Sequence, residues 1–141
     1  MKIIIASDHA GYKLKEELKE ELKQLGHETE DLGTDSEEPV DYPEYGKKAA
    51  KEAASSGNKG ILLCGSGIGM SIVANKIKGV RAALCHNEYT ARAAREHTDA
   101  NVLCLGARDI DTETAKKLTK IFLETEASQE ERHKRRVNKI E

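Results

Sequence analysis

Residues 60–71 restrict the fold of this chain more than any other stretch. They open with a short apolar run, Ile61 to Leu63, which is typical of a fully buried strand. Glycines then alternate at positions 65, 67 and 69, and an apolar segment with the pattern of a helix starts at Met70. A strand, a glycine turn and a helix in this order direct free backbone N–H groups at an anion. We therefore expect an anion-binding turn, and a plain tight turn is the alternative for this stretch alone.

Cys64 stands where the predicted strand ends and the turn begins. A thiol there feels the positive end of the helix dipole, which favours thiolate. The alternative is a small buried apolar residue. The turn lacks the Lys-Ser/Thr ending of a P-loop, and its spacing differs from the G-x-G-x-x-G of dinucleotide sites. A small anion is thus favoured over a nucleotide.

Length and composition exclude several classes of protein. The 141 residues predict one domain over 1–141. A net charge of −2 gives no support for nucleic-acid or membrane binding, and no apolar run approaches the roughly 20 residues of a membrane helix. The short apolar N-terminus does not fit a signal peptide, so a cytoplasmic protein is expected. The cysteines form no C-x-x-C pair, so we expect no zinc site and no disulfide framework.

Elsewhere, apolar runs alternate with segments of helical periodicity. Strands are predicted at 2–7, 27–32, 61–63, 80–85 and 101–105, and helices at 12–25, 45–55, 70–76, 88–96, 111–124 and 128–140, the last capped by Ser128. This alternation predicts an α/β fold of three layers, with helices on both faces of a five-stranded parallel sheet. Ligands of such sheets bind beyond the carboxyl ends of the strands.

Several titratable side chains are expected at that edge of the sheet. They are Asp8 and His9 after the first strand, Cys64 after the third, Cys85 and His86 after the fourth, His97 and Asp99 in the loop into the fifth, and Arg108 after the fifth. An exposed turn histidine is the alternative for His9, and a helix-end histidine paired with the dipole is the alternative for His97. We expect His86 to be structural.

The C-terminal helix at 128–140 carries a run of basic residues, which is usually a solvated face. Arg132 and Arg136 are four residues apart and therefore point the same way. Two guanidinium groups on one face can hold a phosphate dianion. This helix has no place in its own sheet, so we expect it to reach a neighbouring subunit.

These parts together favour a small phosphorylated substrate. The arginines hold its phosphate, the glycine turn stabilises an oxyanion, and a thiolate removes a proton next to a carbonyl. A histidine moves a proton on and off a sugar oxygen. This set of roles fits aldose–ketose isomerisation through an enediolate, without metal or other cofactor.

Several short motifs carry a resemblance to a known family over the full chain. They are Asp8-His9-Ala10-Gly11, Asp41-Tyr42-Pro43, Cys64-Gly65-Ser66-Gly67-Ile68-Gly69-Met70-Ser71, Ala74-Asn75-Lys76, and the closing Arg132-His133 with Arg136-Val137. Together they resemble the type B ribose-5-phosphate isomerases, which are grouped with the galactose-6-phosphate isomerase subunits. The resemblance implies a Rossmann-like sheet of order 2-1-3-5-4. It also implies a homodimer, in some members paired into a tetramer, with metal-free active sites at the dimer interface.

The resemblance also assigns roles to residues at matching positions. Cys64 would be the base that carries a proton between C1 and C2, and His97 would open the furanose ring. Asp8 and Ser66 would hold the reacting hydroxyls. The enediolate would be stabilised by backbone N–H groups from Gly65 to Gly69, including Gly67 and Ile68. Tyr42 would line the sugar site, and phosphate would be bound by His9, Arg108, Arg132 and Arg136, the last two from the partner chain.

Three positions differ among family members. One branch has a glutamate base where this chain has Met70, so the chain resembles the cysteine branch. Thr98 stands at a substrate-binding position that is commonly Asn, and Ser66 stands where many members have Thr. Ser66 keeps the hydroxyl group of Thr, whereas Thr98 has a hydroxyl in place of an amide that both donates and accepts hydrogen bonds at longer reach.

The predicted function is interconversion of ribose 5-phosphate and ribulose 5-phosphate in the pentose phosphate pathway. One alternative is isomerisation of a six-carbon sugar phosphate, such as allose or galactose 6-phosphate. Another is a non-catalytic phosphosugar-binding module, which would have no use for a thiolate. A flavodoxin-like carrier is disfavoured because the chain has few aromatic residues to stack on a flavin.

Overall fold

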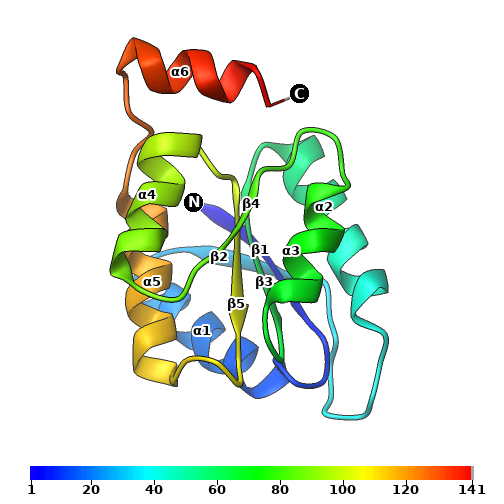
Figure 1. Ribbon diagram of the computed structural model, residues 1–141. Coiled ribbons are helices and arrows are strands. Elements are labelled where there is room, and N and C mark those ends of the chain that lie inside the picture. Colours follow the sequence, from blue (N-terminus) through cyan, green and yellow to red (C-terminus); the bar gives the residue numbers. More distant parts are fainter. Residues whose placement is uncertain (141) are drawn as a thin grey trace.

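The computed structural model describes residues 1–140 and contains one parallel sheet with helices on both faces (Figure 1). In the described residues the strands are β1 Lys2–Ser7, β2 Glu28–Asp31, β3 Lys59–Cys64, β4 Ala82–Leu84 and β5 Val102–Gly106. The helices are α1 Tyr12–Gln24, α2 Tyr42–Ser56, α3 Ile68–Asn75, α4 Glu88–Thr98, α5 Thr112–Glu124 and α6 Glu131–Asn138. The strand order is β2-β1-β3-β5-β4, which confirms the order implied by the resemblance.

The two faces of the sheet bury separate apolar clusters. One cluster packs α1, α4 and α5 against the sheet, and the other packs α2 and α3. Along β1, Ile3 and Ile5 belong to the first cluster, whereas Ile4 and Ala6 belong to the second. Since successive side chains of a strand point to opposite faces, a continuous apolar run supplies both layers.

The edge strand β4 is short and only partly buried. An asparagine from α3 extends its pairing: the Asn75 amide donates to Ala82 O at 3.0 Å, and Ala82 N–H donates back to Asn75 Oδ1 at 2.8 Å. The Asn75 side chain thus forms the pair of hydrogen bonds that a neighbouring strand would form, and it attaches the end of α3 to the sheet.

Two helices, α2 and α6, begin three residues away from their predicted starts. α2 begins at Tyr42 instead of residue 45, because Pro43 lies in the first turn, where a missing N–H costs nothing. α6 begins only at Glu131, with Glu130 as its N-cap residue, and the prediction that Ser128 caps it is wrong. Ser128 Oγ instead accepts the N–H of Glu130 at 3.1 Å, closing a local turn.

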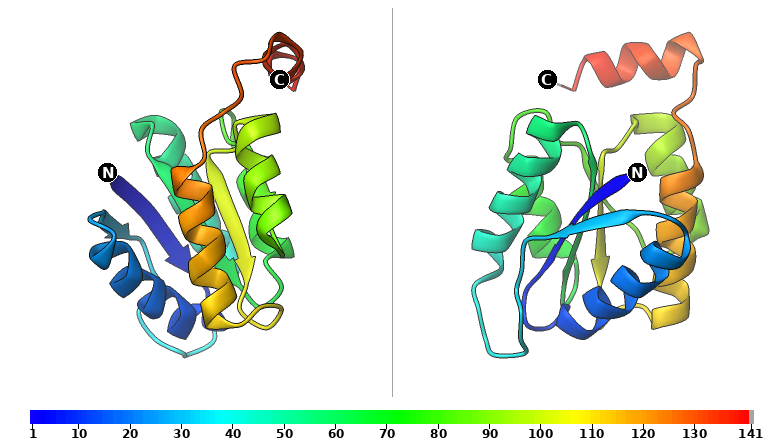
Figure 2. Two further views of the ribbon diagram at one scale, coloured as in Figure 1. Left: turned by 90° about the vertical axis from the view of Figure 1, so that its left-hand side faces the viewer. Right: turned by 180° about the vertical axis from the view of Figure 1, so that it is seen from behind.

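α6 lies across the end of the sheet at which the strands begin, and it packs against α4 (Figures 1 and 2). The linker before it is attached to α4 by Ser128 N–H, which donates to Glu96 O at 3.1 Å. Within residues 1–140 no helix has the length and apolarity needed to cross a membrane.

Candidate active site

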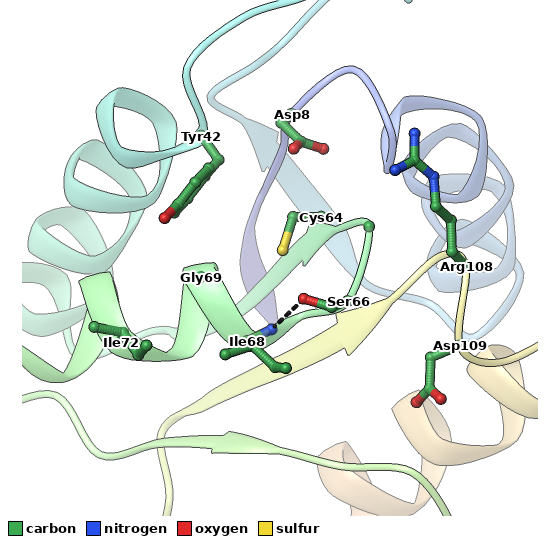
Figure 3. A pocket seen from close by; sticks show the side chains of 10 residues that line it. Asp8, Tyr42, Cys64, Ser66, Ile68, Gly69, Ile72, Arg108 and Asp109 are labelled. Carbon is green, nitrogen blue, oxygen red and sulfur yellow. Dashed lines mark hydrogen bonds between the residues drawn. The ribbon is translucent and has the colours of Figure 1, made fainter.

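A pocket of about 630 Å³ lies at the carboxyl ends of β1, β3 and β5 (Figure 3). It is lined by Asp8, Tyr42, Cys64, Gly65, Ser66, Ile68, Gly69, Ile72, Arg108 and Asp109. Eight of these ten residues were predicted from the sequence. The pocket is where parallel sheets place their ligands.

The turn between β3 and α3 depends on Gly67. Its φ is +79°, and a Cβ there would lie 2.5 Å from Leu84 Cδ1 and 2.9 Å from the carbonyl carbon of Leu105. No other residue fits both the backbone angle and the space. The N–H of Gly67 donates to Cys64 Sγ at 3.1 Å, and the N–H of Ile68 donates to Ser66 Oγ at 3.1 Å. The turn therefore directs N–H groups at the thiol and hydroxyl of the pocket.

The flanking glycines leave room for two larger side chains. A Cβ on Gly69 would lie 2.5 Å from Cε1 of Tyr42, whose ring packs over the first turn of α3 (Figure 3). A Cβ on Gly65 would lie 3.3 Å from the Arg108 guanidinium. Gly65 and Gly69 thus allow Arg108 and Tyr42 to border the pocket on either side of Cys64.

Asp8 and Cys64 reach the pocket together because of the sheet register. Asp8 N–H donates to Leu63 O at 3.2 Å, which aligns the end of β1 with that of β3. Asp8 Oδ1 accepts the N–H of Gly11 at 3.1 Å, and within residues 1–140 Oδ2 accepts no hydrogen bond. Asp8 is 6% exposed and Cys64 is 5% exposed. One carboxylate oxygen is thus held by the backbone while the other is left for a ligand.

Two cationic or proton-donating side chains accompany this pair. Arg108 is exposed and forms no ion pair within residues 1–140, although it borders the pocket. Just outside the lining residues, His9 Nδ1 accepts the N–H of Val40 at 3.1 Å. An Nδ1 that accepts leaves the proton of a neutral ring on Nε2, so His9 has a free donor.

The other two thiols differ from Cys64 in their surroundings. Burial raises the pKa of Cys85 to about 11, against a smaller opposing effect of a hydrogen bond with Thr90. Burial, with the neighbouring Cys64 and Cys85, raises the pKa of Cys104 still further. Neither lines the pocket, so among the described thiols Cys64 is the one placed to act on a ligand.

The prediction that His97 and Asp99 share this rim is wrong. They follow α4 and precede β5, and a segment leading into a strand lies at the amino end of the sheet. In Figure 1 the end of α4 is at the opposite end of the molecule from the β3–α3 turn. Thr98 shares this location and donates its hydroxyl to Ala94 O at 2.6 Å.

Arg132 and Arg136 also lie at the amino end, on α6. Arg132 Nε is 2.7 Å from Glu130 Oε2, whereas Arg136 has no ion pair within residues 1–140. A second hollow, of about 290 Å³, lies here between α4 and α6. It is lined by Glu96, His97, Asp99, Ala127, Ser128, Gln129, His133, Lys134, Val137 and Asn138. One chain thus carries the predicted site in two separate parts.

Sequence reasoning missed two residues of the pocket, Ile72 and Asp109. Ile72 lies one helical turn after Ile68, and Asp109 directly follows Arg108 at the end of β5, so spacing would have found both. Asp109 Oδ2 is 2.5 Å from Nδ1 of His86, so the histidine expected to be structural holds a residue of the pocket wall.

The fold and the pocket define a class of protein: a parallel α/β protein with a thiol, a carboxylate and an arginine around an N–H-rich turn. Within residues 1–140 no three His, Cys, Asp or Glu side chains are grouped as metal ligands. Comparison with known proteins gives the family. The sequence profile of the ribose/galactose isomerase family matches residues 3–140, and the chain belongs to this family.

Individual relatives extend over almost the whole chain. Ribose-5-phosphate isomerase B of Escherichia coli is 42% identical over 99% of this chain and 93% of its own. The structure of ribose-5-phosphate isomerase B from Clostridium thermocellum superposes with a TM-score of 0.96, at 48% identity over 99% of this chain and 95% of that one. The ribose 5-phosphate isomerase from Thermotoga maritima gives a TM-score of 0.94 at 51% identity, covering 99% and 96%.

Proposed function

We propose that this protein interconverts D-ribose 5-phosphate and D-ribulose 5-phosphate through an enediolate, with Cys64 as the base. The observation that carries the proposal is the pocket around Cys64, in which a buried thiol and a buried carboxylate face an N–H-rich turn. Beside them is Arg108, which forms no ion pair in the described part of the chain. The names of the relatives in the same family support a pentose phosphate as the substrate. We also propose a cytoplasmic location and a role in the pentose phosphate pathway, because both fit this function.

The chemistry divides between three groups of the pocket. The Cys64 thiolate takes the proton from C2 of the open aldose and returns it to C1, so that the C1 carbonyl becomes a hydroxyl and C2 becomes the ketone. Asp8 and Ser66 hold the O1 and O2 hydroxyls between which the second proton moves. Backbone N–H groups of residues 65–69 that are not already donated to Cys64 Sγ and Ser66 Oγ stabilise the enediolate oxygen. The turn is built before the charge forms, so the protein does not have to reorganise around it.

The phosphate binds at the side of Arg108. Among residues 1–140 no carboxylate pairs with its guanidinium, which borders the pocket, and planar guanidinium groups match phosphate oxygens with paired hydrogen bonds. His9 adds the Nε2–H donor that its bond to Val40 leaves free. Tyr42 closes the opposite side over the sugar.

A second copy of the chain completes the site. His97, Arg132 and Arg136 lie at the far end of the same chain, so His97 of the partner subunit opens the furanose ring and the partner's arginines bind the phosphate. The pocket wall supports this arrangement because Ile68 and Ile72 are 53% and 57% exposed on α3. Large apolar side chains beside a functional pocket are typical of a surface that another chain covers. We therefore propose a homodimer with shared active sites.

The first experiment assays purified protein with ribose 5-phosphate in the presence of a metal chelator, with ribulose 5-phosphate as the measured product. Allose 6-phosphate and galactose 6-phosphate are assayed beside it. We expect turnover that is fastest with ribose 5-phosphate and unaffected by the chelator. Cys64→Ala is the matched variant: it should lose turnover and keep its affinity for the substrate, since the thiol acts on carbon and not on phosphate.

Three other results would change the proposed function in different ways. Turnover of a hexose phosphate alone would keep the mechanism and change the substrate. Equal loss of affinity and turnover in Cys64→Ala would contradict its role as the base. An absence of turnover from folded, reduced protein would replace the enzyme by a phosphosugar-binding module.

A further inference from the structure

The rings of His97 and His133 stack face to face in the hollow between α4 and α6. Their centroids are 4.8 Å apart and their planes differ by 9°. His97 lies in the last turn of α4 and His133 in the first turn of α6. The His133 side chain is 12% exposed, although α6 contains no fully buried residue. The ring contact is therefore part of the packing between these two helices.

The stack is the contact that orients His97. Within residues 1–140 the His97 side chain forms no hydrogen bond and no ion pair, and the residue as a whole is exposed. The χ2 torsion of a histidine side chain adopts a broad range of values when no contact restrains the ring. A nearly parallel ring whose centroid is 4.8 Å away restricts that torsion and fixes the plane in which the ring nitrogens lie.

We propose that His133 is a positioning residue for ring opening, which it supports by holding the imidazole of His97 in a fixed plane. The inference rests on the proposed function, in which His97 acts on the furanose in the other subunit of the dimer. Ring opening breaks the bond between C1 and the ring oxygen, moves a proton off the C1 hydroxyl and puts one on the ring oxygen. Both proton transfers need a ring nitrogen in line with the sugar oxygens, so free rotation of the imidazole would slow them.

The surroundings of His133 allow its stacking to be tested separately from its polarity. Within residues 1–140 its ring has one ion-pair contact, with Glu130, whose Oε2 lies 3.8 Å from His133 Nε2, beyond hydrogen-bond distance. A phenyl ring at this position can therefore keep the stack without losing a hydrogen bond. His133→Phe preserves the ring, and His133→Ala removes it.

Ring opening can be measured apart from isomerisation in the Cys64→Ala protein. This variant lacks the base for carbon but keeps His97, so it should exchange the α and β anomers of ribose 5-phosphate without forming ribulose 5-phosphate. Magnetisation transfer between the anomeric carbons of substrate labelled with ¹³C at C1 gives the exchange rate. His133→Ala and His133→Phe are added to this background, with His97→Ala as the reference for full loss.

We expect Cys64→Ala to accelerate anomer exchange over buffer, and His97→Ala to remove that acceleration. His133→Ala should lower it by roughly tenfold to a hundredfold, while His133→Phe retains most of it. The dissociation constant for ribose 5-phosphate should stay nearly the same in all of them. Circular dichroism and the sedimentation coefficient check that each variant is folded and keeps its assembly.

Four results would overturn the inference. Exchange in His133→Ala as fast as in Cys64→Ala would show that the stack positions nothing. A His133→Phe protein as slow as His133→Ala would show that the imidazole is needed for its polarity. Weaker binding in His133→Ala, matching that of Arg136→Ala, would reduce His133 to structural support for α6. No acceleration by Cys64→Ala while the wild type isomerises would remove the ring-opening role of His97 but leave the proposed isomerase intact.

Discussion

At the scale of single residues, three thiols lie in and beside the sheet, and their surroundings give them different chemistry. Cys64 borders the pocket and accepts the N–H of Gly67. Cys85 and Cys104 lie away from the pocket, and burial raises the pKa of both. A thiol must ionise to react as a nucleophile, so the raised pKa values disfavour Cys85 and Cys104, and its position on the pocket selects Cys64.

The first prediction concerns alkylation of these thiols. Iodoacetamide near neutral pH should modify Cys64 and leave Cys85 and Cys104 unmodified, because thiols with raised pKa values stay protonated there. Cys85 should become reactive only as the pH rises toward about 11. Peptide mass spectrometry of the folded protein measures this, and ribose 5-phosphate should protect Cys64. Equal labelling of Cys85 and Cys64 in folded protein would contradict the assignment.

A second prediction uses two glycines with opposite effects. Gly69→Ala places a methyl group where the Tyr42 ring lies, so turnover of ribose 5-phosphate should fall while stability is kept or improved, since Ala is the better helix former by about 1 kcal/mol. Gly57→Ala is the control: with φ of +75° and open space around it, it should cost about 1 kcal/mol of stability and no activity. Urea unfolding and initial rates separate the two. Full activity in Gly69→Ala would show that Tyr42 does not shape the site.

At the scale of elements, an ionic cluster joins α1 to the edge strand β2. The Lys15 side chain is 1% exposed, and its Nζ lies 2.5 Å from Asp31 Oδ2. Lys19 Nζ lies 2.8 Å from the same oxygen, and Gly33 N–H donates to Asp31 Oδ1 at 2.9 Å. Burial alone would raise the pKa of Asp31, but these hydrogen bonds outweigh it and hold that pKa below its usual 3.8. The cluster therefore stabilises the attachment of β2 only while Asp31 is ionised.

The third prediction follows from the lowered pKa of Asp31. A carboxyl group whose pKa is lowered on folding contributes stability above its unfolded pKa and loses it as the pH falls through the folded value. Asp31→Asn should therefore lower the free energy of unfolding at neutral pH by about 2 kcal/mol, between the values of exposed and buried pairs. It should also flatten the loss of stability below about pH 4.

Asp35→Asn is the matched control for that experiment, since Asp35 is exposed and forms no ion pair within residues 1–140. Urea titrations of the three proteins across acid pH give the comparison. An acid response in Asp31→Asn as steep as in the wild type would show that other carboxylates govern it.

At the scale of the whole molecule, the two parts of the proposed site lie at opposite edges of the sheet within one folded subunit. Cys64 lies at the carboxyl edge of the sheet, and His97 and Arg136 lie at the amino edge (Figures 1 and 2). A folded chain of this size cannot bring them together, so the proposed mechanism needs two subunits with each site shared between them.

The fourth prediction tests this sharing. Cys64→Ala and Arg136→Ala proteins, each inactive or weak alone, should regain activity when their subunits are mixed. Random exchange makes half of the dimers hybrids, and one of the two sites in each hybrid is intact, so recovery should reach about a quarter of the wild-type rate. Native mass spectrometry confirms that exchange has occurred. Hybrids without recovered activity would contradict shared sites.

Local sequence patterns sufficed for much of this protein. Ile61 to Leu63 with the glycines that follow predicted the strand, turn and helix, since these depend on periodicity and on the backbone freedom of nearby residues. The same reasoning placed Asp8, Cys64 and Arg108 at one edge, because all three directly follow strands, and parallel strands end together. The resemblance supplied the strand order, which periodicity alone does not specify.

The tertiary structure decided which residues share a site. His97 and Asp99 were misplaced for a reason that element order could have corrected, because a segment that leads into a parallel strand lies at the amino end of that strand. The packing of Tyr42 over Gly69 and the stack of His97 on His133 join residues 27 and 36 positions apart, and no pattern within one element encodes such contacts. Local forces select elements, whereas the site depends on how distant elements are brought together by burying their apolar faces.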